Sequence, residues 1–441
     1  MKIPERPPRI EMTEELLKLL QNREVSELLR KINDDYLSWE EIKRHSPLPA
    51  GIDAKKLWTL VRMSRGHMSD ITLGRYWFFF NLYTSSNMQQ KLHEIDLNSG
   101  GLPVTGLKIS NEDKRMYVIS SMMEEAIASS QLEGAATTRK VAKEMLRTGR
   151  KPRNVAEKMI LNNYNSMNNL SSMTEKPLTI ELIREIQSTI TKDTLEKKEW
   201  EGKFRDHDEL RVHWNPTGEI LHTPPQHEEI EELLKKYCEF ANSNDARYIH
   251  PVVKAAILHF LMGYIHPFED GNGRTARTIT YWYLLRNRYW IIKFMTISRV
   301  INHAKTKYAQ AYLNSETDDN DITYFIKFQI DAIDQALKDL RDYIKRKLEE
   351  KKDMYRFLKI PGINERQAQI LLEFFNEPNR IMTIEEVETQ FLVVYQTARV
   401  DMLVLEKTGF LEKKKAGKKL LFFRAYKFEK VLDEYTKTEN K

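Results

Sequence analysis

Apolar residues recur at steps of three and four along most of the chain, and few segments alternate with a period of two. This spacing puts apolar side chains on one face of a helix, so the sequence predicts a mainly α-helical protein. We expect helical stretches at residues 14–29 and 74–95, and another helix from Asn111 to a stop near Gly134. One stripe of that last helix holds Met116, Ile119, Met123, Ala126 and Ile127.

Residues 202–225 break this pattern with mixed polar and β-branched residues around the turn Asn215-Pro-Thr-Gly218, which predicts a β-hairpin. Helical spacing returns at residues 251–287 and again from Asp321. The helix from Asp321 sets an apolar stripe against a strongly charged face, which is typical of a connector out of a main domain. The stripe consists of Ile333, Leu337, Leu340, Ile344 and Leu348.

The C-terminal segment follows a different order of elements. Thr383-Ile-Glu-Glu386 forms a capping box that opens a short helix, and Thr397 opens a second helix with Val400, Leu403 and Leu405. Gly409 then precedes two short strands around residues 413–419. Two helices followed by a β-ribbon predict a winged helix-turn-helix.

These patterns divide the chain into four expected segments. Residues 1–105 form an N-terminal helical region that ends at the linker-like stretch Asn98–Pro103. Residues 106–335, with the helix at 111–134, form the main core, 336–365 a connecting helix, and 366–441 the winged-helix domain.

Composition narrows the class of protein. The chain has 441 residues, 41% of them hydrophobic, and a net charge of +6 from 70 basic and 64 acidic residues, a mixture that does not demand nucleic acid as a partner. No apolar run is long enough to span a membrane, and MKIPERPPRI lacks the apolar region of a signal peptide, so we expect a cytoplasmic protein. Cys238 is the one cysteine, which excludes an internal disulfide and a cysteine-based zinc site. We expect it to be buried or incidental.

The strongest chemical signal is HPFEDGNGRTAR at residues 266–277, called the glycine-rich loop below. The glycines free successive backbone N–H groups at the start of a helix, where they and the helix dipole can bind an anion. Arg274 and Arg277, three residues apart, can reach neighbouring phosphates. Asp270 offers a hard oxygen to Mg²⁺, and the pKa of His266 suits taking a proton from a hydroxyl. The alternative is a glycine-rich turn with a satisfied histidine and a solvated arginine face.

The loop resembles the signature of the Fic family, His-x-Phe-x-Asp/Glu-Gly-Asn-Gly-Arg-x-x-Arg, at every fixed position. The resemblance implies a helical Fic-like core with a small β-hairpin flap, in which AMP is transferred from ATP to a Ser, Thr or Tyr hydroxyl of a target protein. It implies that His266 is the general base and Asp270 the Mg²⁺ ligand. It also implies that Asn272 and the surrounding amides bind the α-phosphate region, and Arg274 and Arg277 the β- and γ-phosphates. The implied phosphate-binding set is Gly271, Asn272, Gly273, Arg274, Thr275, Ala276 and Arg277.

The segment Ser129-Ser-Gln-Leu-Glu133-Gly134 resembles the inhibitory motif of the same family. Glu133 would pair with Arg277 through a bidentate contact and so occupy the group that should hold the γ-phosphate. The resemblance also allows Glu133 to assist the removal of AMP from a modified target, so an AMP-removing enzyme is an alternative function. A capped helix end without a regulatory role is the other reading of this short pattern.

The region at residues 204–225 resembles the flap that holds a Fic target by backbone pairing. His207, His213 and His222 lie there, but their spacings are too loose to predict a metal site. Arg211 and Trp214 are loop surface or target contacts. Tyr308 and Tyr312 are candidates for an adenine pocket or for helical core.

The winged helix suggests a function of another class, a regulator that binds DNA or protein. The helix from Thr397 would enter the major groove, and the lysines of KKKAGKK at residues 413–419 would contact phosphates. Asp401 and Glu406 on that helix would face a polyanion poorly, which argues against DNA. Resemblance to the family also allows a homodimer.

Overall fold

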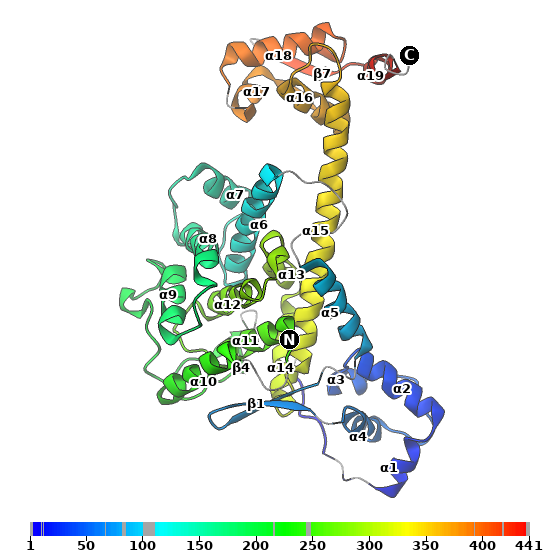
Figure 1. The fold of residues 1–441 in the computed structure, drawn as a ribbon, viewed down its shortest axis with the longest axis vertical. Helices are drawn as coiled ribbons and strands as arrows, with labels where there is room; N and C mark the ends of the chain where they lie inside the picture. The colour runs from blue at the N-terminus through cyan, green and yellow to red at the C-terminus, as the bar shows by residue number, and fades with distance from the viewer. Residues whose placement is uncertain are drawn as a thin grey trace. The chain divides into compact units, whose positions relative to one another are not determined.

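The protein is described by a computed structural model, which covers residues 3–9, 11, 13–66, 68–81, 85–99, 111–214, 217–243, 248–391, 393–416 and 419–437. It divides into two compact units, residues 1–340 and 341–441. Helices dominate both, which confirms the predicted class (Figure 1). The finer division into four segments stays a prediction.

The N-terminal region contains short helices and one hairpin. Its elements are α1 (Glu14–Leu19), α2 (Arg23–Asp34), α3 (Trp39–Ile42), α4 (Ala54–Ser64), β1 (Ser69–Leu73), β2 (Tyr76–Phe80) and α5 (Ser86–Ser99). The predicted helix at 14–29 is therefore two helices, because the side chain of Asn22 caps a new start at α2. The predicted helix at 74–95 was wrong in its first part.

A β-hairpin replaces the start of that predicted helix. β1 and β2 pair antiparallel, and Ile71, Leu73, Phe78 and Phe80 point to the buried face. Gly74 at the turn has φ +56°, a backbone conformation that favours glycine. The aromatic run Tyr76-Trp-Phe-Phe-Phe80 suits a half-buried strand better than a helix. The helix prediction rested on the spacing of apolar residues and left this strand preference out of account.

The rest of the first unit is a helical core. It consists of α6 (Asn111–Leu132), α7 (Arg139–Thr148), α8 (Val155–Met173), α9 (Ile180–Thr191), η1 (Lys198–Trp200), β3 (Val212–Trp214), β4 (Glu219–His222), η2 (His227–Glu229), α10 (Ile230–Asn242), α11 (Pro251–Ile265), α12 (Asn272–Arg286), η3 (Trp290–Phe294), α13 (Ile297–His303), α14 (Lys305–Thr317) and the start of α15 (Thr323–Leu358). β3 and β4 confirm the predicted hairpin. The predicted linker lies at the end of α5 and, from Gly100 on, outside the described residues.

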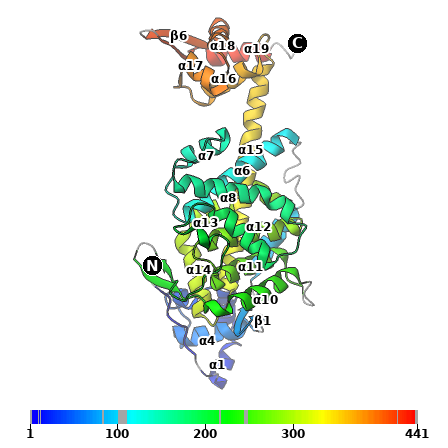
Figure 2. The ribbon, with the colours of Figure 1, turned by 90° about the vertical axis from the view of Figure 1, so that its left-hand side faces the viewer.

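α11 and α12 form the centre of this core. α11 is apolar on nearly all sides and almost entirely buried, as expected for a helix enclosed by others. α12 packs against α11, α8 and α9, and Figure 2 shows α12 between α8 above it and α11 below it. The turn between α11 and α12 is the glycine-rich loop, so two rigid helices position it. Cys238 on α10 is buried, as expected.

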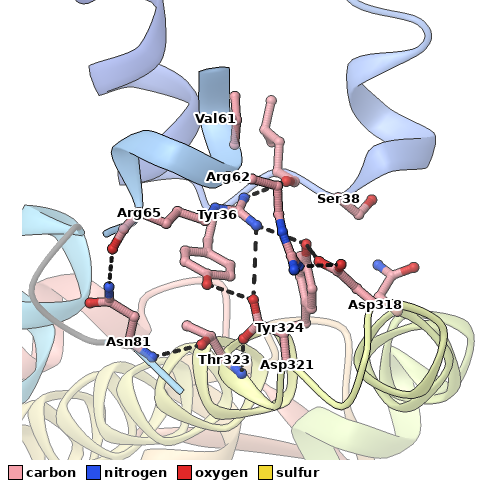
Figure 3. A network of polar contacts seen from close by, with 12 residues as sticks. Tyr36, Ser38, Val61, Arg62, Arg65, Asn81, Asp318, Asp321, Thr323 and Tyr324 are labelled. Carbon is pink, nitrogen blue, oxygen red and sulfur yellow. Dashed lines mark hydrogen bonds and ion pairs between the residues drawn. The ribbon is translucent and has the colours of Figure 1, made fainter. Parts of the chain in front are cut away.

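A buried polar network attaches the N-terminal region to the turn between α14 and α15 (Figure 3). Arg65, at the end of α4, is 2% exposed; its guanidinium donates to the Tyr324 hydroxyl at 2.9 Å and lies 3.8 Å from the Tyr36 ring centroid. Tyr36 in turn donates to Asp321 at 2.7 Å. Backbone bonds from Phe79 to Asn320 and from Ile322 to Phe79 add a parallel bridge. The N-terminal region is therefore fixed to the segment that joins α14 to α15 and to the start of α15.

The second unit contains the end of α15, then α16 (Glu365–Asn376), β5 (Ile381–Thr383), α17 (Ile384–Phe391), α18 (Tyr395–Lys407), β6 (Leu411–Ala416), β7 (Lys419–Arg424) and α19 (Phe428–Lys437). The strands form an antiparallel sheet of order β5-β7-β6. α18 begins two residues before the predicted Thr397, and the Thr383 hydroxyl caps α17 as predicted, accepting from Glu386 N at 3.2 Å. None of the helices within the described residues is both long and apolar enough to cross a membrane.

Candidate functional site

The glycine-rich loop is held in shape by its own backbone and by two side chains. His266 ends α11 in a left-handed conformation (φ 47°), and Gly271 precedes α12 with φ 85°. Phe268 is fully buried and anchors the loop in the core. The Asn272 side chain accepts from Phe268 N at 3.0 Å and donates to Phe268 O at 2.7 Å. Asn272 therefore stabilises the loop, and both the oxygen and the nitrogen of its side-chain amide are already hydrogen-bonded to the backbone.

His266 has a defined tautomer and is neutral over a wide pH range. Its Nδ1 lies 3.1 Å from the Gly263 carbonyl oxygen, which can only accept, so Nδ1 carries the hydrogen and Nε2 keeps the lone pair. Burial lowers the pKa of His266 to about 4, although the bond to Gly263 and the charge of Glu133 oppose the shift. At neutral pH the imidazole can accept a proton at Nε2.

Asp270 and Arg274 contact each other. Asp270 Oδ2 accepts from Arg274 at 2.9 Å, while Oδ1 accepts from Gly271 N at 2.6 Å. The Asp270 side chain is half exposed and Arg274 is fully buried, with Nε of Arg274 unpartnered. Within the described residues no group of three or more His, Cys, Asp or Glu is placed to hold a metal. One carboxylate fits Mg²⁺ only where water and substrate phosphates supply the remaining ligands.

Arg277 is held by the C-terminal end of α6. Its Nε donates to Ser129 Oγ at 2.8 Å, and its Nη2 donates to Ser129 O at 3.0 Å and to Glu133 Oε1 at 2.8 Å. The amide of Glu133 bonds to Ser130 O, so the Ser129 carbonyl at the helix end accepts the arginine instead. The hydrogen bond from Arg277 to Glu133 uses one carboxylate oxygen, so the expected bidentate geometry was wrong.

The Glu133 carboxylate lies directly over the N-terminus of α12. No side chain at Gly271 caps this helix, and a Cβ added to Gly273 would overlap Glu133 Oε1. Burial alone would raise the pKa of Glu133, but the charges of Arg277 and Arg274 outweigh it and the pKa is lowered. An ionised carboxylate therefore occupies the anion-binding end of the helix.

A cavity of about 190 Å³ opens beside this carboxylate. Its lining joins α6, the glycine-rich loop, α12, the hairpin and α14 through Glu133, His266, Gly273, Ala276, His222, Tyr308 and Tyr312, among others. Small-molecule pockets are commonly about 300–1,000 Å³, so this cavity accommodates only part of a nucleotide as it stands. Both tyrosines proposed for an adenine pocket border it. Thr275, which lies beside Ala276 near the start of α12, is fully buried.

The hairpin at residues 204–225, called the flap below, borders the cavity. Its three histidines do not converge: His207 contacts Glu269 at 2.8 Å, His213 contacts Gly218 O, and His222 bridges Glu316 and the Tyr264 carbonyl. Arg211 donates to the carbonyls of Asp208 and Leu210, within the flap. Each side chain therefore has a local partner.

Two buried residues with a role in the site escaped prediction. Gln187 on α9 donates to Asp270 O at 3.0 Å and accepts from Gly202 N at 2.6 Å. Arg205 bonds to the backbone of His266 and Pro267. The sequence did contain a signal for Gln187, because a glutamine among Ile183, Ile186 and Ile190 on an apolar helix face needs hydrogen-bond partners. No local pattern marks Arg205.

Comparison with known proteins agrees with this geometry. Residues 177–284 match the family described as Fic/DOC. A protein adenylyltransferase Fic of Nematostella vectensis is 36% identical over 109 residues, which are 24% of this chain and 23% of that protein. One of Aedes aegypti is 32% identical over 116 residues, 26% of this chain and 22% of that protein. The chain thus matches less than a quarter of the length of these relatives.

A solved structure is similar over a larger part of the chain. The structure of Fic-1 (residues 134–508) from C. elegans aligns with a TM-score of 0.51, over 75% of this chain and 88% of that chain, at 16% identity. At this identity the likeness shows the fold alone. The sequence match and the fold together show that the protein contains a Fic domain.

Proposed function

We propose that this Fic-domain protein transfers AMP from ATP to a side-chain hydroxyl of a target protein, and that Glu133 inhibits the transfer. The observation that carries the proposal is the Glu133 carboxylate over Gly273, because that position at the N-terminus of α12 suits a phosphate equally well. The neutral His266 beside the same cavity supplies a base. Sequence similarity to proteins named protein adenylyltransferase favours AMP over other transferred groups.

The proposed chemistry uses the residues of the loop in turn. The hydroxyl oxygen of the target attacks the α-phosphorus of ATP, its proton passes to His266 Nε2, and the bond from the α-phosphorus to the bridging oxygen breaks to release pyrophosphate. The amides at the start of α12, with Gly271, Gly273, Thr275 and Ala276, would bind phosphate oxygens, as would Arg274 and Arg277. Asp270 would hold Mg²⁺, which neutralises phosphate charge. The Asn272 side chain would shape the loop.

Inhibition follows from competition for one place. A γ-phosphate and the Glu133 carboxylate would both need Arg277 and the space over Gly273. A displacement of about 1 Å can lower a rate by roughly a hundredfold. Ser129 holds Arg277 independently of Glu133, so release of Glu133 would leave the arginine already oriented. The same glutamate remains a candidate for assisting AMP removal.

Labelling with α-³²P-ATP tests the proposal. The Glu133→Gly chain should modify itself or a lysate protein at least tenfold faster than the parent, and the added mass should be that of AMP. His266→Ala in that background should abolish the signal, because no base takes the proton. Glu124→Gln is a matched control, since Glu124 on the same helix pairs with Arg139 and Lys143 away from the cavity. Equal labelling by parent and Glu133→Gly would contradict the inhibition.

The flap is the proposed docking place for the target. β3 and β4 form a two-stranded sheet, and an extended target segment can pair with the edge of such a sheet. Ile220 on β4 is 50% exposed and would contact an apolar target side chain.

A second candidate function is favoured by one observation in the second unit. Asp401, which seemed to argue against nucleic acid on α18, is 2% exposed and accepts from Arg366, Gln367 and Asn364. That expectation was wrong because the side chain faces α16. Glu406 is paired with Lys413 at 3.1 Å. Arg399 on α18 and Lys414 and Lys415 on β6 are exposed.

We infer a winged-helix module that binds double-stranded DNA through α18 and the β6–β7 hairpin. Fluorescence anisotropy with the full chain should show affinity that falls as salt rises. Arg399→Glu should weaken binding and reduce the slope of log affinity against log salt by about 1 or more. Lys430→Glu, the same charge change on α19, is the control. Binding that is absent, or indifferent to Arg399, would reject this function.

A further inference from the structure

The flap and the glycine-rich loop meet at one buried residue, Arg205. Its side chain is 1% exposed although it lies in an irregular segment of the chain. Arg205 Nε donates to His266 O at 3.1 Å, and its backbone N–H donates to Pro267 O at 2.9 Å. One residue thus fixes two successive carbonyl groups at the point where the proposed base leaves α11.

The same guanidinium also ties both ends of the flap together. Nη1 donates to His207 O at 2.9 Å and to Asp208 Oδ1 at 3.2 Å, and Nη2 donates to the Pro225 carbonyl. Four of the five guanidinium N–H groups therefore have acceptors in the flap or the loop. Only a planar fork of donors can serve acceptors in these different directions at once; a lysine nitrogen cannot.

The backbone of His266 needs such support. A residue other than glycine at φ 47° is strained and persists only where its surroundings fix it. On the α11 side, His266 N donates to Met262 O and its Nδ1 to Gly263 O, both at 3.1 Å. On the other side Arg205 fixes the next two carbonyls. The backbone that carries the imidazole is therefore held between the end of a rigid helix and a single arginine.

We propose that Arg205 is a positioning residue: it holds His266 Nε2 in the direction of attack and keeps the flap, where the target docks, in register with that base. The proposal rests on the proposed function for its catalytic consequence. It predicts that losing the fork lowers turnover without weakening nucleotide binding, because none of the acceptors of Arg205 lies on α12, Glu133 or the aromatic wall of the cavity.

The test compares Arg205→Lys with Arg150→Lys, both in the Glu133→Gly background. Arg150 lies outside the flap and the glycine-rich loop and donates to Lys151 O and the Glu157 carboxylate, so it is a control for the exchange of arginine for lysine. Arg205→Lys should lower kcat for AMP transfer about tenfold to a hundredfold, with the Kd for ATP within twofold of the parent. Limited proteolysis should cleave residues 208–222 several-fold faster in Arg205→Lys, and Arg150→Lys should match the parent in all three measurements.

Unchanged kcat in Arg205→Lys would overturn the proposal. So would a loss of ATP binding and thermal stability in proportion to the loss of kcat, since that pattern describes a general structural role. Absence of AMP transfer in the Glu133→Gly parent would count against the proposed function alone. The proteolysis, which needs no activity, would then decide whether Arg205 holds the flap: parent-like cleavage rejects it, and faster cleavage supports it.

Discussion

Among the buried arginines of the first unit that contact carboxylates, Arg65 lies in the polar network and Arg277 beside the glycine-rich loop. Arg65 and its partner Asp321 are both 2% exposed, and aromatic rings and protein hydrogen-bond partners surround the guanidinium (Figure 3). Arg277 is 5% exposed, but its partner Glu133 is 27% exposed and borders a cavity. The chemistry of the pairs is alike. The pairs differ in whether solvent or a ligand can reach the carboxylate. Asp321 is enclosed, so its contact with Arg65 attaches two parts of the fold, whereas a carboxylate beside a cavity, such as Glu133, can be exchanged for another anion.

Replacing each arginine by methionine should give the largest difference between the two regions. Arg65→Met leaves the Asp321 carboxylate buried, and breaking a buried pair in this way destabilises by about 3–5 kcal/mol. Arg277→Met should destabilise by only about 1–2 kcal/mol, because Glu133 can be hydrated through the cavity. Scanning calorimetry of the full chain measures both, and equal shifts in Tm would break the comparison.

The two regions should also respond to pH in opposite directions. Burial and the charge of Asp321 raise the pKa of Asp318 in the network to about 6, from 3.8. The folded state then binds more protons than the unfolded state between these values, so this contribution to stability is present at low pH and is lost as pH rises from about 4 to 6. A shift of about two units corresponds to about 3 kcal/mol. Asp318→Asn should remove this slope from a plot of Tm against pH.

His266 should contribute the opposite slope. Burial lowers its pKa to about 4 from 6.5, so the unfolded state binds more protons and stability is lost as pH falls from about 6.5 to 4. His266→Asn should remove that loss, and AMP transfer should not decline until pH approaches 5. An activity midpoint near pH 6.5 would show that the imidazole is as hydrated as a free histidine.

The smallest effect concerns nucleotide binding at the pair of Arg277 and Glu133. Glu133→Gln keeps the volume of the side chain but removes the negative charge beside Arg277, which in the proposed inhibition competes with phosphate. A non-hydrolysable ATP analogue should bind this variant about tenfold more tightly than the parent, equal to about 1.4 kcal/mol. Titration calorimetry measures the difference, with Glu124→Gln as control. If charge removal leaves the affinity unchanged, Glu133 obstructs by volume alone.

Local patterns predicted most helices and much of the chemistry of the site. Spacing gave α6, α11 and α12, and the turn at 215–218 gave the flap, because these depend on neighbours in the chain. The helix expected at 74–95 failed where aromatic residues fit both a helical stripe and a strand, and packing selected the strand. Asp401 was misjudged because a helical position does not say which neighbouring helix covers it.

The sequence by itself determined the glycine-rich loop between two helices, since its glycines, arginines and histidine stand at fixed spacings, and the resemblance to the Fic family indicated that Glu133 pairs with Arg277. Tertiary structure alone decided three features of the site. Glu133 lies over Gly273, the Asn272 side chain forms hydrogen bonds with the backbone of the loop, and Arg205 joins the loop to the flap. The reason is physical. The contacts of Glu133 and Arg205 join segments 144 and 61 residues apart, and only tertiary packing brings such segments within hydrogen-bonding distance.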